Sequence, residues 1–206
     1  EEINNTGRGS TDGPTVASWN KAIRIMKNTA DVDVKLLVTP GMRHPNVTDE
    51  ATLAAKERFD AVYLMDVVEY DNLNTVVTSS KQNVSSKNTA KNFKDRALDN
   101  SFAAAYFPDV VISDESVPAN GNVQVPPSVA VLGAYSLNDR VGFPWLAPAG
   151  RTRGRLVSAL ETTVKLNGPN LDELYNVDIN PIVSRPGDGG PIVWGQKTLQ
   201  TAKTSF

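Results

Sequence analysis

Cysteine is absent from this sequence of 206 residues, which excludes disulfides, a thiolate nucleophile and a cysteine-based metal site. Long apolar runs are missing as well, since no stretch approaches the roughly 18 residues that a membrane-spanning helix needs. Charge of one sign is not in large excess: the formal net charge is −2. Broad binding to nucleic acid or to an acidic membrane is therefore not indicated. At this length we expect one hydrophobic core.

Sequence motifs for common catalytic sites are also lacking. The chain has no phosphate-cradling glycine loop and no Gly-x-Ser-x-Gly nucleophile elbow. Its single histidine, His44, follows an expected strand, at the sheet edge where α/β proteins bind ligands. A catalytic base and an ordinary loop residue are both open, and the lack of a serine in a nucleophile context favours the loop residue.

Four acids cluster around the second expected strand: Asp60, Asp66, Glu69 and Asp71. Acidic side chains at strand ends can hold Mg²⁺. Without a phosphate-binding loop beside them, we expect solvated acids or partners in ion pairs between subunits. We expect no cofactor.

The first half of the chain predicts alternating helices and strands. Pro14 begins a helix with an apolar stripe at Val16, Trp19, Ile23 and Met26. Residues 31–38 form a strand, Thr48 caps a helix over 49–59, and residues 61–68 form an apolar strand. Such a strand–helix–strand unit indicates a parallel sheet. Residues 1–13 are polar and predict a flexible segment before one α/β domain over 14–206.

The second half predicts further elements. We expect a helix over 91–101, a strand within 103–113 with Pro108 at an edge or bulge, and a helix that begins at Pro126-Pro127. Gly133 and Ala134 in that helix let a neighbouring backbone approach closely. A strand or turn over 155–166, a helix over 170–176 and a hairpin of 177–184 with 191–194 complete the chain. The fold class is a mixed, largely parallel sheet flanked by helices, with a C-terminal β-hairpin.

Candidate interface residues lie just after the Pro126 helix. Arg151, Arg153 and Arg155 alternate with other residues, so an extended segment would align three guanidinium groups on one side. Such a strip either docks onto a neighbour that carries carboxylates or is a solvated loop, with a phosphate site as a third possibility. Trp145 lies in an apolar, proline-containing loop that fits a partner surface in its own chain or another.

Five other residues are predicted to be internal fasteners, which hold parts of the same chain together: Asp139, Arg140, Asn180, Trp194 and Lys197. Asp139 can pair with a nearby arginine, and Asn180, inside an apolar strand, can satisfy backbone groups of a neighbouring loop. Trp194 has glycine beside it, so core and interface positions are both open.

Two blocks of sequence resemble contractile tail sheath proteins, the subunits around the tail tube of myovirus-type phages. The first contains Pro126-Pro127-Ser128, Gly133-Ala134-Tyr135, Asn138-Asp139-Arg140, Trp145 and Ala147-Pro148-Ala149-Gly150. The second contains Leu174-Tyr175, Ile179-Asn180-Pro181-Ile182 and Trp194-Gly195-Gln196-Lys197-Thr198-Leu199. Lys197 stands where the family pattern has arginine, and lysine cannot make a forked contact.

The resemblance implies a structural subunit rather than an enzyme. It would polymerise around a tail tube, contact a baseplate and contract to drive the tube through the host envelope. It implies location in the phage tail, after assembly in the bacterial cytoplasm, without direct contact to nucleic acid or insertion into a membrane. We expect the chain to be a core fragment, and monomeric because the linking arms are missing. The alternatives are a hydrolase on an α/β subtilisin-like scaffold and a sheath from a bacterial injection system.

Overall fold

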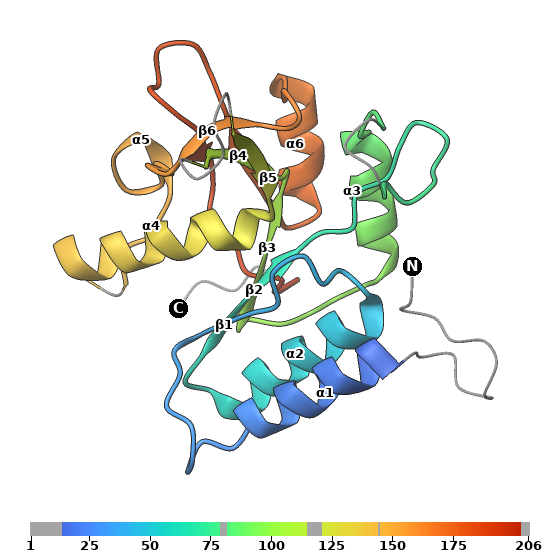
Figure 1. Ribbon diagram of the computed structural model, residues 1–206, viewed down its shortest axis with the longest axis vertical. Coiled ribbons are helices and arrows are strands. Elements are labelled where there is room, and N and C mark those ends of the chain that lie inside the picture. Colours follow the sequence, from blue (N-terminus) through green and yellow to red (C-terminus); the bar gives the residue numbers. More distant parts are fainter. Residues whose placement is uncertain (1–13, 79–81, 115–120, 144, 203–206) are drawn as a thin grey trace.

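The computed structural model describes residues 14–78, 82–114, 121–143 and 145–202 (Figure 1). The segment 1–13, expected to be flexible, lies outside the described residues. None of the described helices is long and apolar enough to cross a membrane.

A five-stranded sheet forms the centre of the fold. Its order is β1-β2-β3-β7-β8, from the strands β1 (Leu36–Val38), β2 (Val62–Asp66), β3 (Ala103–Phe107), β7 (Ile179–Val183) and β8 (Ile192–Val193). The first four strands are parallel, with Leu64 opposite Ala104 and Ala105 opposite Ile179. β8 pairs antiparallel with β7. All residues of β3 and β7 are buried, as expected for parallel strands covered on both faces.

Helices cover both faces of this sheet and make a three-layer core. One face, which includes Tyr63 and Met65, packs against α1 (Pro14–Met26), α2 (Pro45–Arg58), α3 (Ser86–Asp95) and α6 (Gly168–Asn176). The other face, which includes Leu64 and Tyr106, packs against α4 (Pro127–Val141). Figure 1 shows α1 and α2 together on one side and α4 on the other. The alternation of side chains along each strand creates these two apolar faces.

A smaller antiparallel sheet extends from the end of β3. Its order is β5-β4-β6, with β4 (Val110–Ser113) between β5 (Asn122–Val125) and β6 (Ala159–Thr162). A cis peptide bond joins Phe107 to Pro108 in the turn between β3 and β4. A short helix, α5 (Gly150–Arg153), lies between α4 and β6.

The predicted fold class is confirmed: a largely parallel sheet flanked by helices, with an antiparallel β7–β8 pair near the C-terminal end. Several boundaries differ. α2 begins at Pro45 after His44, and Thr48 is a buried residue inside the helix rather than its cap, because proline fits the first helical turn. The first strand is shorter than predicted. α3 begins earlier, after Ser85, whose side chain accepts from the Asn88 N–H.

The region 103–113 was predicted as one strand and is two. Pro108 lies in the turn between them, and β3 is an inner strand of the main sheet rather than an edge. A proline can donate no ladder hydrogen bond, so the strand ends before it. β5 was not predicted from the sequence.

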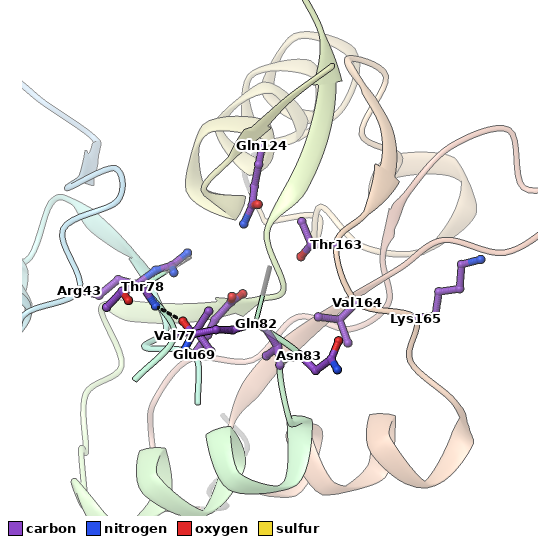
Figure 2. Close-up of a pocket in the computed structure, with 11 residues that line it drawn as sticks. Arg43, Glu69, Val77, Thr78, Gln82, Asn83, Gln124, Thr163, Val164 and Lys165 are labelled. Carbon is purple, nitrogen blue, oxygen red and sulfur yellow. Dashed lines mark hydrogen bonds between the residues drawn. The ribbon is translucent and has the colours of Figure 1, made fainter. Parts of the chain in front are cut away.

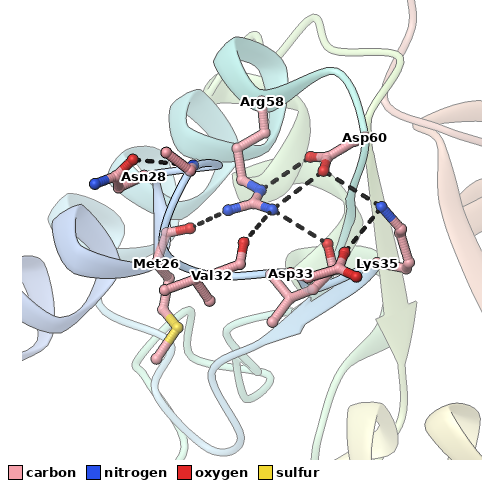
Figure 3. Close-up of polar contacts among 9 residues, drawn as sticks. Met26, Asn28, Val32, Asp33, Lys35, Arg58 and Asp60 are labelled. Carbon is pink, nitrogen blue, oxygen red and sulfur yellow. Dashed lines mark hydrogen bonds and ion pairs between the residues drawn. The ribbon is translucent and has the colours of Figure 1, made fainter.

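A buried arginine fixes the connection between α1 and β1 (Figure 3). The Arg58 side chain is almost fully buried at the end of α2. It donates to the carbonyls of Met26 and Val32, the latter at 3.0 Å, and pairs with Asp60 at 3.0 Å. The planar guanidinium suits this arrangement because it offers several donors in one plane. Two carbonyls at the ends of the connection, those of Met26 and Val32, thus obtain hydrogen bonds from a residue of α2.

Replacement of Arg58 by Met should lower the free energy of unfolding by about 3 kcal/mol, because buried carbonyls and Asp60 lose their partner. Urea denaturation followed by circular dichroism measures this. Lys35→Met is the matched control: Lys35 also pairs with Asp60, but its side chain is 68% exposed. We expect the control to leave the urea midpoint close to that of the wild type, because ion pairs exposed to solvent contribute little. Equal midpoints for the two variants would contradict the structural role of Arg58.

Candidate functional site

Polar side chains gather where β2 and β3 end, and we call this cluster the polar junction: Arg43, Asp66, Glu69, Asp109, Gln124 and Ser128. The three acids and Ser128 are buried, Arg43 is partly buried and Gln124 is exposed. Asp66, the last residue of β2, is only 1% exposed. Its carboxylate accepts from the Gly41 N–H at 3.0 Å, the Ser128 N–H at 2.9 Å and the Ser128 hydroxyl at 2.8 Å. Burial raises the pKa of Asp66, and these donors oppose the rise. Asp66 thereby joins β2 to the loop after β1 and to the first turn of α4.

Asp109 joins the loop after β1 to the smaller sheet. Its carboxylate forms an ion pair with Arg43 and accepts from Gln124 Nε2 on β5 at 2.9 Å. Its backbone carbonyl accepts from both the N–H and the hydroxyl of Thr163, each at 3.0 Å. The two sheets are thus connected through one residue in the turn after β3.

Glu69 has the most perturbed carboxyl of the junction. It is 2% exposed, and its Oε1 accepts only a long hydrogen bond, 3.4 Å, from the Asp109 N–H. Burial, with the negative charge of Asp109 as a second cause, raises the pKa of Glu69 to about 7, and the Arg43 charge opposes this. Near neutral pH this carboxyl is therefore partly protonated.

A polar pocket of about 400 Å³ opens beside the junction (Figure 2). Arg43, Glu69 and Gln124 line it, together with Thr163, Val164 and Lys165 and with residues 77–78 and 82–84. Within the described part of the chain, no group of three or more His, Cys, Asp or Glu side chains could hold a metal ion. The charged groups of the junction lie mostly against one another, as Arg43 does against Asp109. The cluster therefore connects structural elements.

Two of the four acids that we expected to be solvated, or to pair between subunits, are instead buried. Asp66 and Glu69 lie inside the junction because Gly41, Ser128 and Asp109 supply N–H donors there. Asp60 pairs with Arg58 and Lys35. Asp71 accepts from Leu73 and Thr75 in its own turn.

No catalytic triad is assembled among the described residues. Ser128 is hydrogen-bonded to Asp66, but it is 0% exposed and the acid contacts it directly, with no histidine between them. His44 precedes α2, and its buried Nδ1 has no hydrogen-bond partner. A triad needs histidine between the nucleophile and the acid. The arrangement therefore gives no support to a hydrolase.

The arginine strip does not form the extended segment that was predicted. Residues 150–153 wind into α5, which begins at Gly150 with φ +79° and closes with a Gly154 N–H to Gly150 carbonyl bond. Arg151 pairs with Asp188 at 3.2 Å, and Arg155 donates to the Gly189 carbonyl. Arg153 is exposed. The glycine permits the left-handed turn into α5, so alternation in sequence does not become alternation in space.

Trp145 is exposed, as an interface residue would be. Its side chain is 77% exposed and stacks on Phe143, with ring centroids 4.7 Å apart. Asn138 donates to the Leu146 carbonyl at 2.6 Å and holds this loop against α4. Asp139 and Arg140, predicted as internal fasteners, are both exposed, and neither forms an ion pair with another described residue. They lie on the outer side of α4, away from the sheet.

Asn180 is fully buried in β7 and bonds to the backbone of a distant segment. Its Nδ2 donates to the Lys197 carbonyl at 2.8 Å, and its Oδ1 accepts from the Lys197 N–H at 2.6 Å. The Lys197 ammonium lies 3.8 Å from the centre of the Tyr175 ring. Trp194 is exposed, and the Arg185 guanidinium lies over its ring, 4.3 Å from the ring centre. The Asn180 amide thus makes the two backbone hydrogen bonds that a neighbouring strand would make, at a position beyond the end of β8.

Sequence reasoning missed Arg43, Asp109, Gln124 and Ser128. Three of them follow or begin an element: Arg43 lies after β1, Asp109 after Pro108, and Ser128 in the first turn of α4. Gln124 lies within β5, a strand that the sequence did not predict. The positions of Arg43, Asp109 and Ser128 at element ends were the available signal, because the carboxyl ends of parallel strands meet at one edge of a sheet.

Solved structures with this fold belong to contractile injection machines. Two are from the anti-feeding prophage. The contracted helical sheath matches with a TM-score of 0.58 and 20% identity, over 88% of this chain and 44% of that chain. The six-fold baseplate matches with a TM-score of 0.59 and 20% identity, over 88% of this chain and 42% of that chain. A third is the contracted PVC sheath complex of an extracellular contractile injection system. It matches with a TM-score of 0.61 and 22% identity, over 92% of this chain and 50% of that chain. The fold is therefore that of a contractile sheath protein.

Sequence comparison gives the same class. The chain is 33% identical over 85 residues to the tail sheath protein of Vibrio phage KVP40 and 29% identical over 85 residues to that of Enterobacteria phage T4. These matches cover 41% of this chain and only 12% and 13% of the relatives. No protein-family model matches. The resemblance to contractile tail sheath proteins is confirmed.

Replacement of Glu69 by Gln should change how stability depends on pH. In the wild type the folded carboxyl keeps its proton up to about pH 7, while the unfolded one loses it near 4.5, so stability falls as pH rises through this window. Gln cannot titrate. We expect the stability of Glu69→Gln relative to wild type to rise between pH 5 and pH 8, on the order of 2 kcal/mol.

Urea denaturation at several pH values measures this difference. Asp71→Asn is the control: hydrogen bonds from Thr75 lower the pKa of Asp71 from its ordinary value of 3.8, so its contribution is fully present above that value and is lost only at lower pH. We therefore expect the stability difference between Asp71→Asn and wild type to stay constant between pH 5 and pH 8. A constant difference between wild type and Glu69→Gln across this range would show that Glu69 titrates normally.

Proposed function

We propose that this chain is the core part of a structural subunit of a contractile phage tail sheath. The observation that carries this proposal is the agreement between two comparisons: phage tail sheath proteins in sequence, and contracted sheaths in fold. The chain spans about an eighth of the sheath proteins that it matches in sequence and about half of the solved chains that it matches in fold. Residues 14–206 form one α/β core domain of that subunit.

In this proposal the subunit polymerises with copies of itself around a tail tube and contacts a baseplate. Contraction drives the tube through the host envelope. The structural neighbours come from a baseplate assembly and from a helical sheath. This supports self-association of the subunit and its contact with a baseplate. The protein is located in the phage tail after assembly in the bacterial cytoplasm. Because the sequence matches are to phages, we favour a phage over a bacterial injection device.

The proposed role is structural and needs no catalytic group or cofactor. The polar junction supports this, because its buried carboxylates are bonded to backbone N–H groups and to an arginine that connect β1, β2, α4 and the smaller sheet. Such bonds make a domain rigid, which a subunit needs if it moves as a unit during contraction.

Negative-stain electron microscopy of the gene product that contains this chain tests the proposal, with this chain alone as comparison. We expect hollow tubes from the gene product. We expect single particles from this chain alone, at micromolar concentration, because it spans only part of the length of the sheath proteins that it matches. Dispersed particles in both samples, under conditions where the protein is folded, would contradict the sheath function.

A further inference from the structure

A groove of about 400 Å³ lies between α4 and the segment 155–158 and is separate from the polar junction. Its floor is apolar, and an arginine from α4 and one from the segment after α5 stand at its border. We call it the α4 groove; its lining residues are Ala130, Gly133, Ala134, Leu137, Arg140, Arg155, Val157 and Ser158. Val157 is 79% exposed, so the groove and its border present apolar surface to solvent.

Gly133 lies in the middle of α4, and nothing within the described chain explains a glycine there. A Cβ atom built on Gly133 would meet no atom within 4 Å. Its backbone is helical rather than left-handed, since the residue lies well inside α4. A glycine inside a helix lowers stability relative to alanine. Because the fold itself does not need the space, the missing side chain fits close approach from outside.

The border of the groove carries positive charge without carboxylate partners. Arg140 forms no ion pair with another described residue, and Arg155 donates to a carbonyl, that of Gly189, rather than to a carboxylate. Since the whole chain has a net charge of −2, its remaining surface is net negative. A second copy of this chain therefore offers the complementary sign.

An exposed aromatic platform continues this surface at the end of α4. Val141 and Phe143 are 73% and 57% exposed, and Phe143 stacks on Trp145. The Asn138 side chain and a Leu146 N–H to Phe143 carbonyl bond hold the loop in place. Rigid, exposed aromatic side chains are typical centres of protein interfaces.

We propose that the α4 groove and this aromatic platform bind a second copy of the chain. An apolar side chain of the neighbour fills the space over Gly133, and a neighbouring carboxylate pairs with Arg140. This inference rests on the proposed sheath function. The contact is between unlike surfaces of two copies, and such head-to-tail contacts generate rings or open helical polymers rather than closed dimers.

The small size of the groove agrees with a monomeric isolated chain. A groove that admits one or two side chains buries far less than the roughly 1,200 Å² of a stable interface. Its affinity in isolation is low, and it gains strength when many subunits are held together in one polymer.

Gly133→Leu tests the proposal, because the new side chain fills the groove in open space and favours the helix. The matched control is Gly168→Leu on α6, where a Cβ also meets nothing within 4 Å. Both substitutions are made in the gene product that contains this chain, and the mass of sedimenting tubes is measured. We expect Gly133→Leu to reduce it by about tenfold or more, and Gly168→Leu to leave it within about twofold of wild type.

Thermal unfolding of the same samples separates a lost contact from a lost fold. Gly133→Leu should unfold at or above the wild-type temperature. Arg140→Glu is a second variant that leaves the core intact; it should also lower assembly, and Lys91→Glu on the exposed side of α3 should not.

Equal assembly of Gly133→Leu and Gly168→Leu would overturn the docking groove and leave the sheath function standing. Absence of tubes in the wild type as well would overturn the function and the groove together. If Gly133→Leu destabilised the gene product but not this chain alone, another part of the same molecule would cover the groove, which would overturn contact with a second copy.

Discussion

The carboxylate of Asp66 is the constraint on which the rest of the arrangement depends. A buried carboxylate is strongly destabilising unless donors replace its water. Gly41 and Ser128 supply three of them, so the loop after β1 and the start of α4 must both reach the end of β2. The positive end of the α4 dipole faces the same charge. The position of α4 over the second face of the sheet follows from this requirement.

Much of the fold could be predicted from local pattern. Apolar runs around Leu64 and Ala104 indicate buried parallel strands, and Pro126-Pro127 marks the start of α4. The polar junction could not be predicted in this way. Whether Glu69 is solvated or buried depends on Arg43 and Asp109, which lie far from it in sequence. The same limit explains the arginine strip, where a single backbone angle at Gly150 replaces an extended segment by a helical turn.

Two asparagines in the blocks that resemble sheath proteins have the same structural role. Asn180 bonds to the backbone at Lys197 as a strand neighbour would, and Asn138 bonds to the loop that carries Trp145. Each amide satisfies backbone groups where regular pairing is absent. The fold match extends over 88% of the chain, and the sequence match over 41%. A fold can be kept with few such residues, provided that the apolar faces keep their pattern.

The pairing of β3 with β7 has a consequence for the order of folding. Ala105 lies opposite Ile179, so the smaller sheet, α4, α5 and α6 all intervene between two neighbouring strands. Closure of so long a segment costs entropy before its contacts form, and pairings of this kind slow folding. During synthesis, β1, β2 and β3 emerge first and leave the outer edge of β3 unpaired. Such an apolar edge can pair with another chain, so a chaperone that covers it at that stage would limit aggregation.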